Sequence, residues 1–247
     1  MKQIKSIFII LSILVFGTIN SSAQNAETLL QKMDELMTAP KDREATMQMI
    51  LTDKDGDIKE REALIQQKGT DKKLYRYTKP EKQVGTSTLT LPGDVMWLFM
   101  PAFDEPTKIT LLAKSGSFSG TDFSYEDMSS DTYSDRYDPT LLESKEPATY
   151  LLELVPKSKR SKYSKIILTL DKANSYPVKM EYYDNRDNHF KTSIYKYAKK
   201  DKYWYAQEVE MKDLKKEHST KIIMTDIKFD QGLSDDIFTV ENMQEED

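Results

Sequence analysis

The stretch from residue 176 to residue 212, YPVKMEYYDNRDNHFKTSIYKYAKKDKYWYAQEVEMK, determines the fold class of this chain. Its first part places four apolar or aromatic side chains on alternate positions, Tyr176, Val178, Met180 and Tyr182, with Lys179 and Glu181 between them. Its last part repeats the pattern with Tyr203, Tyr205, Val209 and Met211 against Glu208, Glu210 and Lys212. Such alternation is typical of antiparallel strands with one face on a core and one in water.

Similar runs extend in both directions along the chain. They predict eleven or twelve strands, at residues 47–51, 58–67, 74–78, 86–91, 95–100, 108–112, 150–155, 165–170, 176–183, 190–197, 204–211 and 220–229. Short turn sequences such as Asp184-Asn185 separate them. A strongly curved sheet or a barrel manages the edges of so many sequential strands. A sandwich of two sheets would give the same pattern, so both arrangements stay open.

Two segments depart from the strand pattern. Residues Leu29–Met37 have apolar side chains at helical spacing, and Pro40 ends that run, which predicts one amphipathic helix. The segment Ser115–Pro147 is polar and acidic, and we expect a long loop with a helical turn or two. The expected class is therefore mainly β with flanking helices.

The composition is that of one globular domain. The chain has 247 residues, 38% of them hydrophobic and 31% charged, with 8 Gly and 9 Pro and no linker-like stretch. The net charge of −5 argues against nucleic acid as a partner, because that affinity depends on neutralising phosphates. The absence of Cys excludes thiol catalysis, zinc–thiolate sites and disulfides.

The first 23 residues have the features of a secretory signal peptide. Lys2 and Lys5 precede an apolar run at residues 7–16, and Ala23 ends a group of small residues. We expect cleavage near Ala23, a single mature domain at residues 24–247, and export to the periplasm. An uncleaved anchor is the alternative. Lipid attachment at the cleavage point would need a cysteine, which the chain lacks.

The sequence contains no complete catalytic motif. His189 and His218 lack partners at metal-ligand spacing, and we expect both on the solvent-exposed surface. The run Gly116–Gly120 resembles a nucleophile elbow, but Phe118 stands where a hydrolase needs Ser. The run Asp53–Asp57 lacks the Gly and Glu of a calcium loop and is interpreted as a turn between strands. We expect no enzyme activity and no cofactor.

The acidic segment is the best candidate for binding a hard metal ion. It contains six carboxylates that could coordinate Ca²⁺, namely Asp122, Glu126, Asp127, Asp131, Asp135 and Asp138. The alternative is a solvated loop in which carboxylates and serines such as Ser124 and Ser129 cap helical turns. We favour the capping role and expect no metal.

The run Val95–Met100, followed by Phe103, is apolar on both sides of a strand, so both sides must be covered. Methionine adapts to irregular apolar partners, and the chain has 12 Met, 14 Tyr and 9 Phe. These features permit a barrel with an interior cavity for a hydrophobic ligand. Ordinary core packing is the other interpretation.

Three runs in fixed order resemble one family. They are Val84-Gly85-Thr86, Trp97-Leu98-Phe99-Met100-Pro101 and SFSGTDFSYEDM at residues 117–128. Their order and spacing resemble the outer-membrane lipoprotein-sorting proteins, the LolA-like family. The Asp53–Gly56 turn followed by Arg61, and His218-Ser219-Thr220, fit as well. Thr121 departs from the usual Ser, and residues 102–108 are less basic than in relatives. The motif positions are Gly85, Gly120, Asp122, Phe123, Tyr125 and Asp127.

The resemblance implies a half-open, strongly curved antiparallel β-barrel of about eleven strands, with an N-terminal helix and a helical or loop lid. It also implies a periplasmic carrier that binds the acyl chains of lipoproteins or another envelope lipid. An inner-membrane transporter and an outer-membrane acceptor would be its partners, and we expect a monomer. The cavity or lid residues that we predict are Leu29, Met33, Met47, Met49, Leu89, Trp97, Phe99, Phe103, Phe118, Phe123, Met180 and Tyr205.

Two other functions stay open. One is an interaction module with a filled core that serves an envelope transporter complex. The other is a lipid hydrolase that uses a carboxylate of the acidic segment, Asp122, Glu126 or Asp127.

Overall fold

A computed structural model describes residues 17–110, 113 and 116–245 of the chain. Most of the predicted signal peptide, residues 1–23, lies outside the described residues. Helix α1 (Gly17–Met37) is the first described element and includes the predicted helix at residues 29–37. None of the helices within the described ranges is long and apolar enough to cross a membrane.

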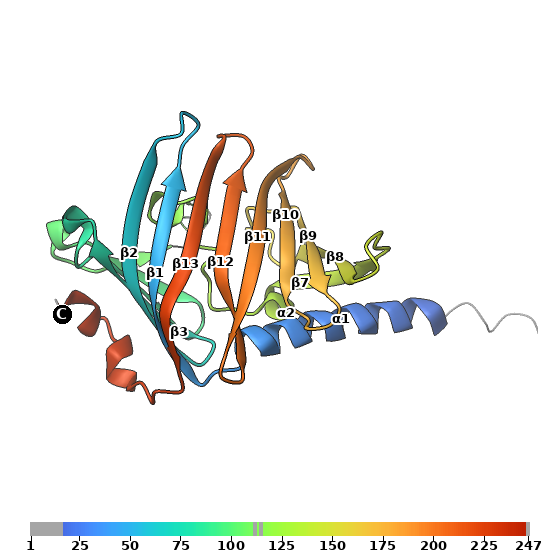
Figure 1. Cartoon of the computed structure of the whole chain (residues 1–247), viewed down its shortest axis with the longest axis horizontal. Helices are drawn as coiled ribbons and strands as arrows, with labels where there is room; N and C mark the ends of the chain where they lie inside the picture. Colours follow the sequence, from blue (N-terminus) through green and yellow to red (C-terminus); the bar gives the residue numbers. More distant parts are fainter. Residues whose placement is uncertain (1–16, 111–112, 114–115, 246–247) are drawn as a thin grey trace, which may run out of the picture.

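The described residues form one antiparallel sheet of thirteen strands (Figure 1). The strands are β1 (Asp42–Thr52), β2 (Ile58–Lys68), β3 (Lys72–Lys79), β4 (Ser87–Leu91), β5 (Val95–Phe99), β6 (Thr107–Ile109), β7 (Tyr137–Leu142), β8 (Thr149–Pro156), β9 (Lys165–Asp171), β10 (Pro177–Tyr183), β11 (His189–Lys200), β12 (Tyr203–Asp213) and β13 (His218–Phe229). Their order in the sheet is β6-β5-β4-β3-β2-β1-β13-β12-β11-β10-β9-β8-β7. A two-sheet sandwich is therefore excluded, and the sheet curves without closing.

Twelve strands match the predicted runs, although residues 111 and 112 of the run 108–112 lie outside the described residues. Strand β7 is the one that the prediction of about eleven omitted. It lies within the segment 115–147, which we expected to be a loop. Its sequence, YDPTLL, has Asp138 and Pro139 in place of an apolar alternation. Proline is tolerated there because β7 is an edge strand. The Asp53–Asp57 turn does join β1 to β2, and Gly56 has the positive φ of +87° that such a turn requires.

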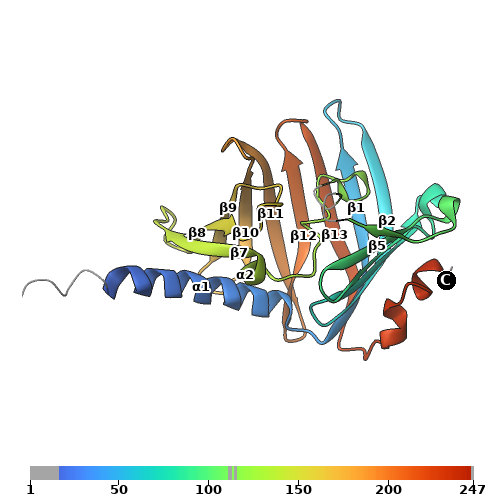
Figure 2. The same cartoon turned by 180° about the vertical axis from the view of Figure 1, so that it is seen from behind.

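The strand order requires one connection to join the two opposite edges of the sheet. From β1 the chain proceeds outward to β6 at one edge, and it resumes with β7 at the opposite edge. The described part of this connection, residues 116–136, crosses the open side (Figure 2). We call it the plug segment. It contains the short helices η4 (Phe118–Gly120) and α2 (Tyr133–Arg136).

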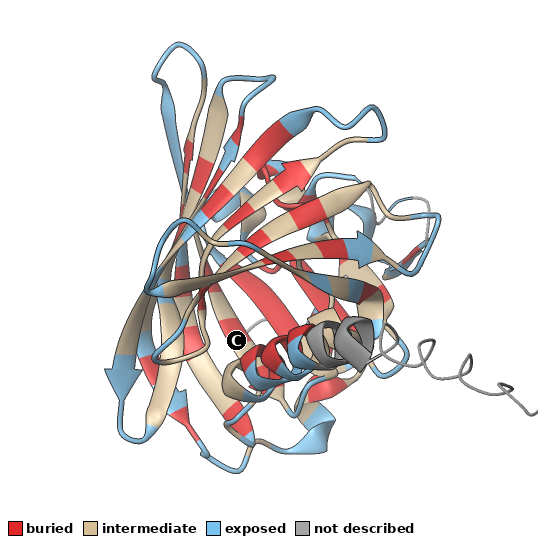
Figure 3. Cartoon of the chain, turned by 90° about the vertical axis from the view of Figure 1, so that its right-hand side faces the viewer, coloured by how far each residue is buried: buried red, intermediate tan, exposed pale blue. Residues whose placement is uncertain are grey.

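The main core lies on the concave face, where the buried positions of the strands converge (Figure 3). Helix α1 adds Ala26, Leu29, Leu30 and Met33 to this core, and it contacts β7, β12 and α2. Phe118 and Phe123 enter the same core from the plug segment. Helix and plug segment together therefore cover the concave face that the open sheet leaves exposed.

A second core lies on the other face of β3, β4 and β5. There the C-terminal helices η5 (Asp235–Phe238) and η6 (Asn242–Gln244) pack against the sheet and form a cluster of Leu74, Leu89, Phe99, Phe238 and Met243. Ser87 donates a hydrogen bond of 2.6 Å to the Met243 carbonyl and fixes this cover. The run Val95–Met100 is thus covered on both sides, as its sequence predicted.

Candidate functional site

A cavity of about 220 Å³ lies on the concave face, next to the end of α1. Its walls come from α1, from β1, β2 and β3, from β11, β12 and β13, and from the plug segment. The side chains that line it include Met37, Arg43, Ala45, Met47, Ile65, Gln67, Lys73, Tyr75, Phe123, Met128, Tyr133, Arg136, Tyr195, Tyr197, Trp204, Tyr205, Val209, Ile222, Met224 and Ile227. The cavity is therefore mostly apolar and aromatic, with a few charged groups.

Strand register separates the polar and apolar parts of the cavity wall. One cross-strand row consists of Arg43, Gln67 and Lys73 on β1, β2 and β3. The row two residues deeper consists of Ala45, Ile65 and Tyr75. Because side chains two residues apart on a strand point to the same face, the two rows lie side by side in the cavity. The wall changes from polar to apolar within this short distance.

Three of the predicted cavity residues line the cavity, namely Met47, Phe123 and Tyr205. Five others are packed in the main core, namely Leu29, Met33, Met49, Phe118 and Met180. The remaining four lie elsewhere. Leu89, Trp97 and Phe99 face the C-terminal helices, and Phe103 is 69% exposed. None of these four is among the cavity-lining residues, and the chain's own C-terminal segment covers Leu89, Trp97 and Phe99.

The sequence reasoning missed the charged part of the site. Arg43, Lys73 and Arg136 line the cavity, although their neighbours in the sequence are largely polar. Only for Lys73 did the neighbouring sequence indicate an inward position, because it lies on the same face of β3 as the buried Tyr75 and Tyr77. Arg136 reaches the cavity only because α2 docks beside α1.

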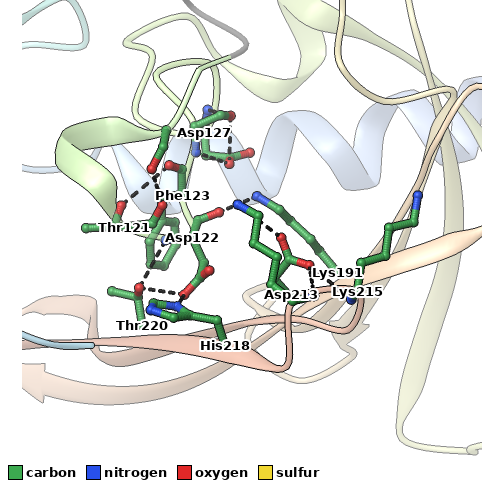
Figure 4. A network of polar contacts seen from close by, with 12 residues as sticks. Thr121, Asp122, Phe123, Asp127, Lys191, Asp213, Lys215, His218 and Thr220 are labelled. Carbon is green, nitrogen blue, oxygen red and sulfur yellow. Dashed lines mark hydrogen bonds and ion pairs between the residues drawn. The ribbon is translucent and has the colours of Figure 1, made fainter. Parts of the chain in front are cut away.

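The motif of the plug segment attaches that segment to the sheet. Asp122 is 3% exposed, and one of its carboxylate oxygens accepts hydrogen bonds from Thr220 and His218, each at 2.7 Å (Figure 4). Its amide donates to the Thr220 hydroxyl at 3.0 Å. The buried Lys191 donates to the Asp122 carbonyl. His218 is thus half-buried against Asp122, which corrects the expectation that it lies on the surface; His189 is exposed.

A second carboxylate of the motif holds the turn that follows. Asp127 accepts hydrogen bonds from the Ser124 amide at 2.7 Å and from the buried Tyr163 hydroxyl at 2.8 Å. Tyr125 packs edge-on against Phe118, with ring centroids 5.3 Å apart. Gly120 has a φ of +75°, in the left-handed region that favours glycine. These motif positions shape and anchor the plug segment.

Glycine is required at position 85 because two loops pack closely there. It has a φ of +80°, and a Cβ atom at this position would lie 3.0 Å from the Pro101 side chain. The two motif runs that contain Gly85 and Pro101 therefore meet in the structure, although 16 positions separate them in the sequence.

The acidic residues of the plug segment are not gathered for a metal ion. Across the described part of the chain, no group of three or more His, Asp or Glu side chains could hold one. Glu126 instead accepts hydrogen bonds from Ser161 and from the Lys162 amide. Asp135 accepts one from Thr132, the residue that caps α2.

Known proteins with the same fold match most of this chain. A family model described as that of an uncharacterized protein matches residues 69–245, more than half of the chain. A Vibrio parahaemolyticus domain described as an outer membrane lipoprotein-sorting protein is 29% identical in sequence. The match covers 90% of this chain and 100% of that domain, with a TM-score of 0.84. The chain belongs to the LolA-like family.

Two further structures support the LolA-like fold. A DUF1329 family protein from Desulfovibrio piger is 25% identical over 90% of this chain and 99% of its own, with a TM-score of 0.84. A LolA superfamily protein from Nitrosomonas europaea is 24% identical over 87% of this chain and 97% of its own, with a TM-score of 0.74. No curated protein matches the chain. The family model begins at residue 69, so α1, β1 and β2 lie before the matched region.

Proposed function

We propose that this LolA-like protein is a monomeric periplasmic carrier that binds acyl chains of a lipoprotein or another envelope lipid. In this proposal it receives its cargo from an inner-membrane transporter and delivers it to an outer-membrane acceptor. The observation that carries the proposal is the apolar cavity between the curved sheet, α1 and the plug segment. The neighbour described as a lipoprotein-sorting domain agrees with it.

The energetics of burial fit a carrier whose cavity is covered by displaceable elements. Each buried CH₂ group of an acyl chain contributes about 0.8 kcal/mol. A sixteen-carbon chain would therefore gain roughly 12 kcal/mol in a fully enclosing site, which is too much for ready release. A carrier needs partial burial, or a cover that must be displaced when the chain enters. Helix α1 and the plug segment are positioned to be that cover.

A non-carrier module with a filled core is the second candidate. Its support is the size of the cavity, because about 220 Å³ is less than the roughly 300–1,000 Å³ of typical ligand sites. In such a module the concave face would contribute to stability, and partners would bind elsewhere. Uptake of an acyl chain into the cavity distinguishes the two candidates.

The two tryptophans of the chain provide that experiment. Trp204 lines the cavity, whereas Trp97 faces the C-terminal helices on the other side of the sheet. Bromine atoms on a fatty-acyl chain quench tryptophan fluorescence at short range. We expect a mid-chain brominated fatty acid to quench the Trp97→Phe variant, which reports Trp204, in a saturable manner. The Trp204→Phe variant, which reports Trp97, is the matched control and should be unaffected.

Two outcomes would contradict the carrier. Absence of quenching in both variants, with both folded by circular dichroism, would favour the filled-core module. Equal quenching in both variants would indicate non-specific binding at the surface. Lipid hydrolysis is tested in the same samples, since release of free fatty acid from an offered phospholipid would show an enzyme.

A further inference from the structure

The cavity has a cationic end that a purely apolar cargo would not require. Arg43 and Lys73 lie in one cross-strand row, with Gln67 between them. Arg136 lines the same cavity from α2. The guanidinium of Arg136 lies over the rings of Tyr133 and Tyr137, at 4.7 and 5.3 Å from their centroids. Three positive side chains from separate elements thus face one small space.

The hydrogen-bond partners of these cations are uncharged among the described residues. Arg43 donates to the Gln67 side-chain carbonyl at 2.5 Å, and Lys73 donates to the Ser129 carbonyl at 3.0 Å. Arg136 donates to the Glu126 carbonyl at 2.9 Å. An ion pair to a carboxylate would satisfy a buried guanidinium more completely than such neutral partners.

Several polar atoms in the cavity wall are buried without any partner in the described structure. They are Nε of Arg43, Nε of Arg136, Oγ of Ser130 and the Tyr197 hydroxyl. A buried donor that makes no hydrogen bond costs about 1–3 kcal/mol. Four such atoms around one cavity point to a ligand that accepts hydrogen bonds there.

Three carboxylates line the cavity together with these cations, namely those of Asp34, Asp127 and Asp131. Asp34 accepts hydrogen bonds from the Tyr133 and Ser134 amides at the start of α2. Asp127 is held by Ser124 and Tyr163. Asp34 and Asp127 therefore stabilise backbone or core groups of the cover, whereas Asp131 raises the pKa of Lys73.

The buried amine of Lys73 lies close enough to Arg43 and Arg136 for their charges to act on its pKa. Burial lowers the pKa of Lys73, and the nearby Arg43 and Arg136 lower it further, while Asp94 and Asp131 raise it; the result is about 7. An anion placed between the three cations would favour the charged form of Lys73 and relieve the repulsion among them.

We infer that the cavity binds an amphiphile with an anionic head group, a carboxylate or a phosphate, held between Arg43, Lys73 and Arg136. Its acyl chain then lies along the apolar row of Ala45, Ile65 and Tyr75 and beneath the plug segment. This inference rests on the proposed carrier function and specifies the chemical class of its ligand. The shared chemistry is an anionic oxygen group, which a lipid head or a free phosphate ion could supply.

The test compares three probes on the full chain at neutral pH, read by Trp204 quenching in the Trp97→Phe background. The probes are a brominated fatty acid, the methyl ester of the same acid, and inorganic phosphate added as a competitor. We expect the acid to bind at least about tenfold more tightly than the ester. Adding Lys73→Met or Arg43→Met should weaken binding of the acid about tenfold, since a hydrogen bond to a charged group is lost. Binding of the ester should not change.

Controls keep the outcomes separate. Lys228→Met removes an exposed cation of β13 and should leave both affinities unchanged. Equal affinities for acid and ester would overturn the inference while the carrier function stands. So would equal weakening of both probes by the substitutions. Displacement of the acid by phosphate alone, at similar concentrations, would show a free-anion site in place of a head-group site. Failure of both acid and ester to bind would overturn the carrier function itself.

Discussion

At the residue scale, the motif carboxylates attach the plug segment to the sheet and hold its turns. Asp122 joins the plug segment to β13 through Thr220 and His218. The sequence marked this aspartate as part of a motif but could not indicate its partners, which lie 96 and 98 positions further along the chain. The side chain is buried, and one of its carboxylate oxygens makes both contacts.

Removing this carboxylate should destabilise the protein. In Asp122→Ala, the Thr220 hydroxyl and the His218 ring lose their acceptor, and buried groups left without partners cost about 1–3 kcal/mol. We expect the free energy of unfolding in urea to fall by about that amount. Asp138→Ala is the matched control, since this carboxylate is 72% exposed and lies 3.9 Å from Lys157. Equal effects of the two substitutions would contradict the anchoring role.

The lowered pKa of Lys73 predicts a pH dependence of stability. The pKa is about 7 in the folded protein and 10.5 in the unfolded chain. Between these values the unfolded state binds more protons, so this residue makes stability rise with pH from about 7 to 10.5. Arg43, Arg136, Asp94 and Asp131 act on the amine across this range. Urea unfolding at a series of pH values should show a smaller rise for Lys73→Met than for the natural chain; identical slopes would refute the prediction.

At the element scale, the C-terminal helices cover one face of the sheet. They cover β3, β4 and β5 on the face opposite the cavity, where Phe238 is 4% exposed. The continuous apolar run Val95–Met100 predicted cover on both faces of the strand, yet it could not say what covers each face. That distinction depends on a segment more than 130 positions away in the chain.

Phe238 and Phe103 form a matched pair for testing this cover. Phe238→Ala removes a buried ring, and we expect the free energy of unfolding to fall by about 3–5 kcal/mol. Phe103 is 69% exposed, so Phe103→Ala should change it by less than about 0.5 kcal/mol. Emission of Trp97, recorded in the Trp204→Phe background, should shift to longer wavelength only in the Phe238 variant. A stable Phe238→Ala protein would show that the helices are dispensable.

At the scale of the whole molecule, the concave face of the open sheet is covered by elements that are not strands. Strands β6 and β7 form its two edges, and the plug segment connects them across the concave face. Helix α1 lies beside this segment, and Asp34 of α1 accepts hydrogen bonds from the first amides of α2. The cavity beneath has only about 220 Å³ in this arrangement.

Entry of an acyl chain should therefore displace the cover and leave the sheet intact. We expect amide hydrogens of α1 and of residues 118–136 to exchange faster when a brominated fatty acid is bound. Those of β1 and β13, which pair at the centre of the sheet, should be unchanged. Hydrogen exchange read by mass spectrometry checks this. Saturable binding with no change in α1 or the plug segment would mean that the chain enters by another route.

The sequence by itself determined the local structure of this protein and its family. Apolar periodicity is a local property. Short strand-like runs located twelve of the thirteen strands of the described residues, and helical spacing located the helix before them. The motif at residues 117–128 identified the family, because it is a continuous run of residues that can be recognised without the fold. Only β7 was missed, since an edge strand accommodates Asp138 and Pro139 without the usual pattern.

The tertiary structure alone decided which side chains line the cavity. Trp97 and Trp204 both lie on strands of the same sheet, yet only Trp204 lines the cavity. Arg43 and Lys73 became neighbours through strand register, and Arg136 joined them through the docking of α2. The sequence pattern of a strand indicates which of its side chains share a face. Which face is enclosed depends on contacts between residues far apart in the chain, and no local pattern contains them.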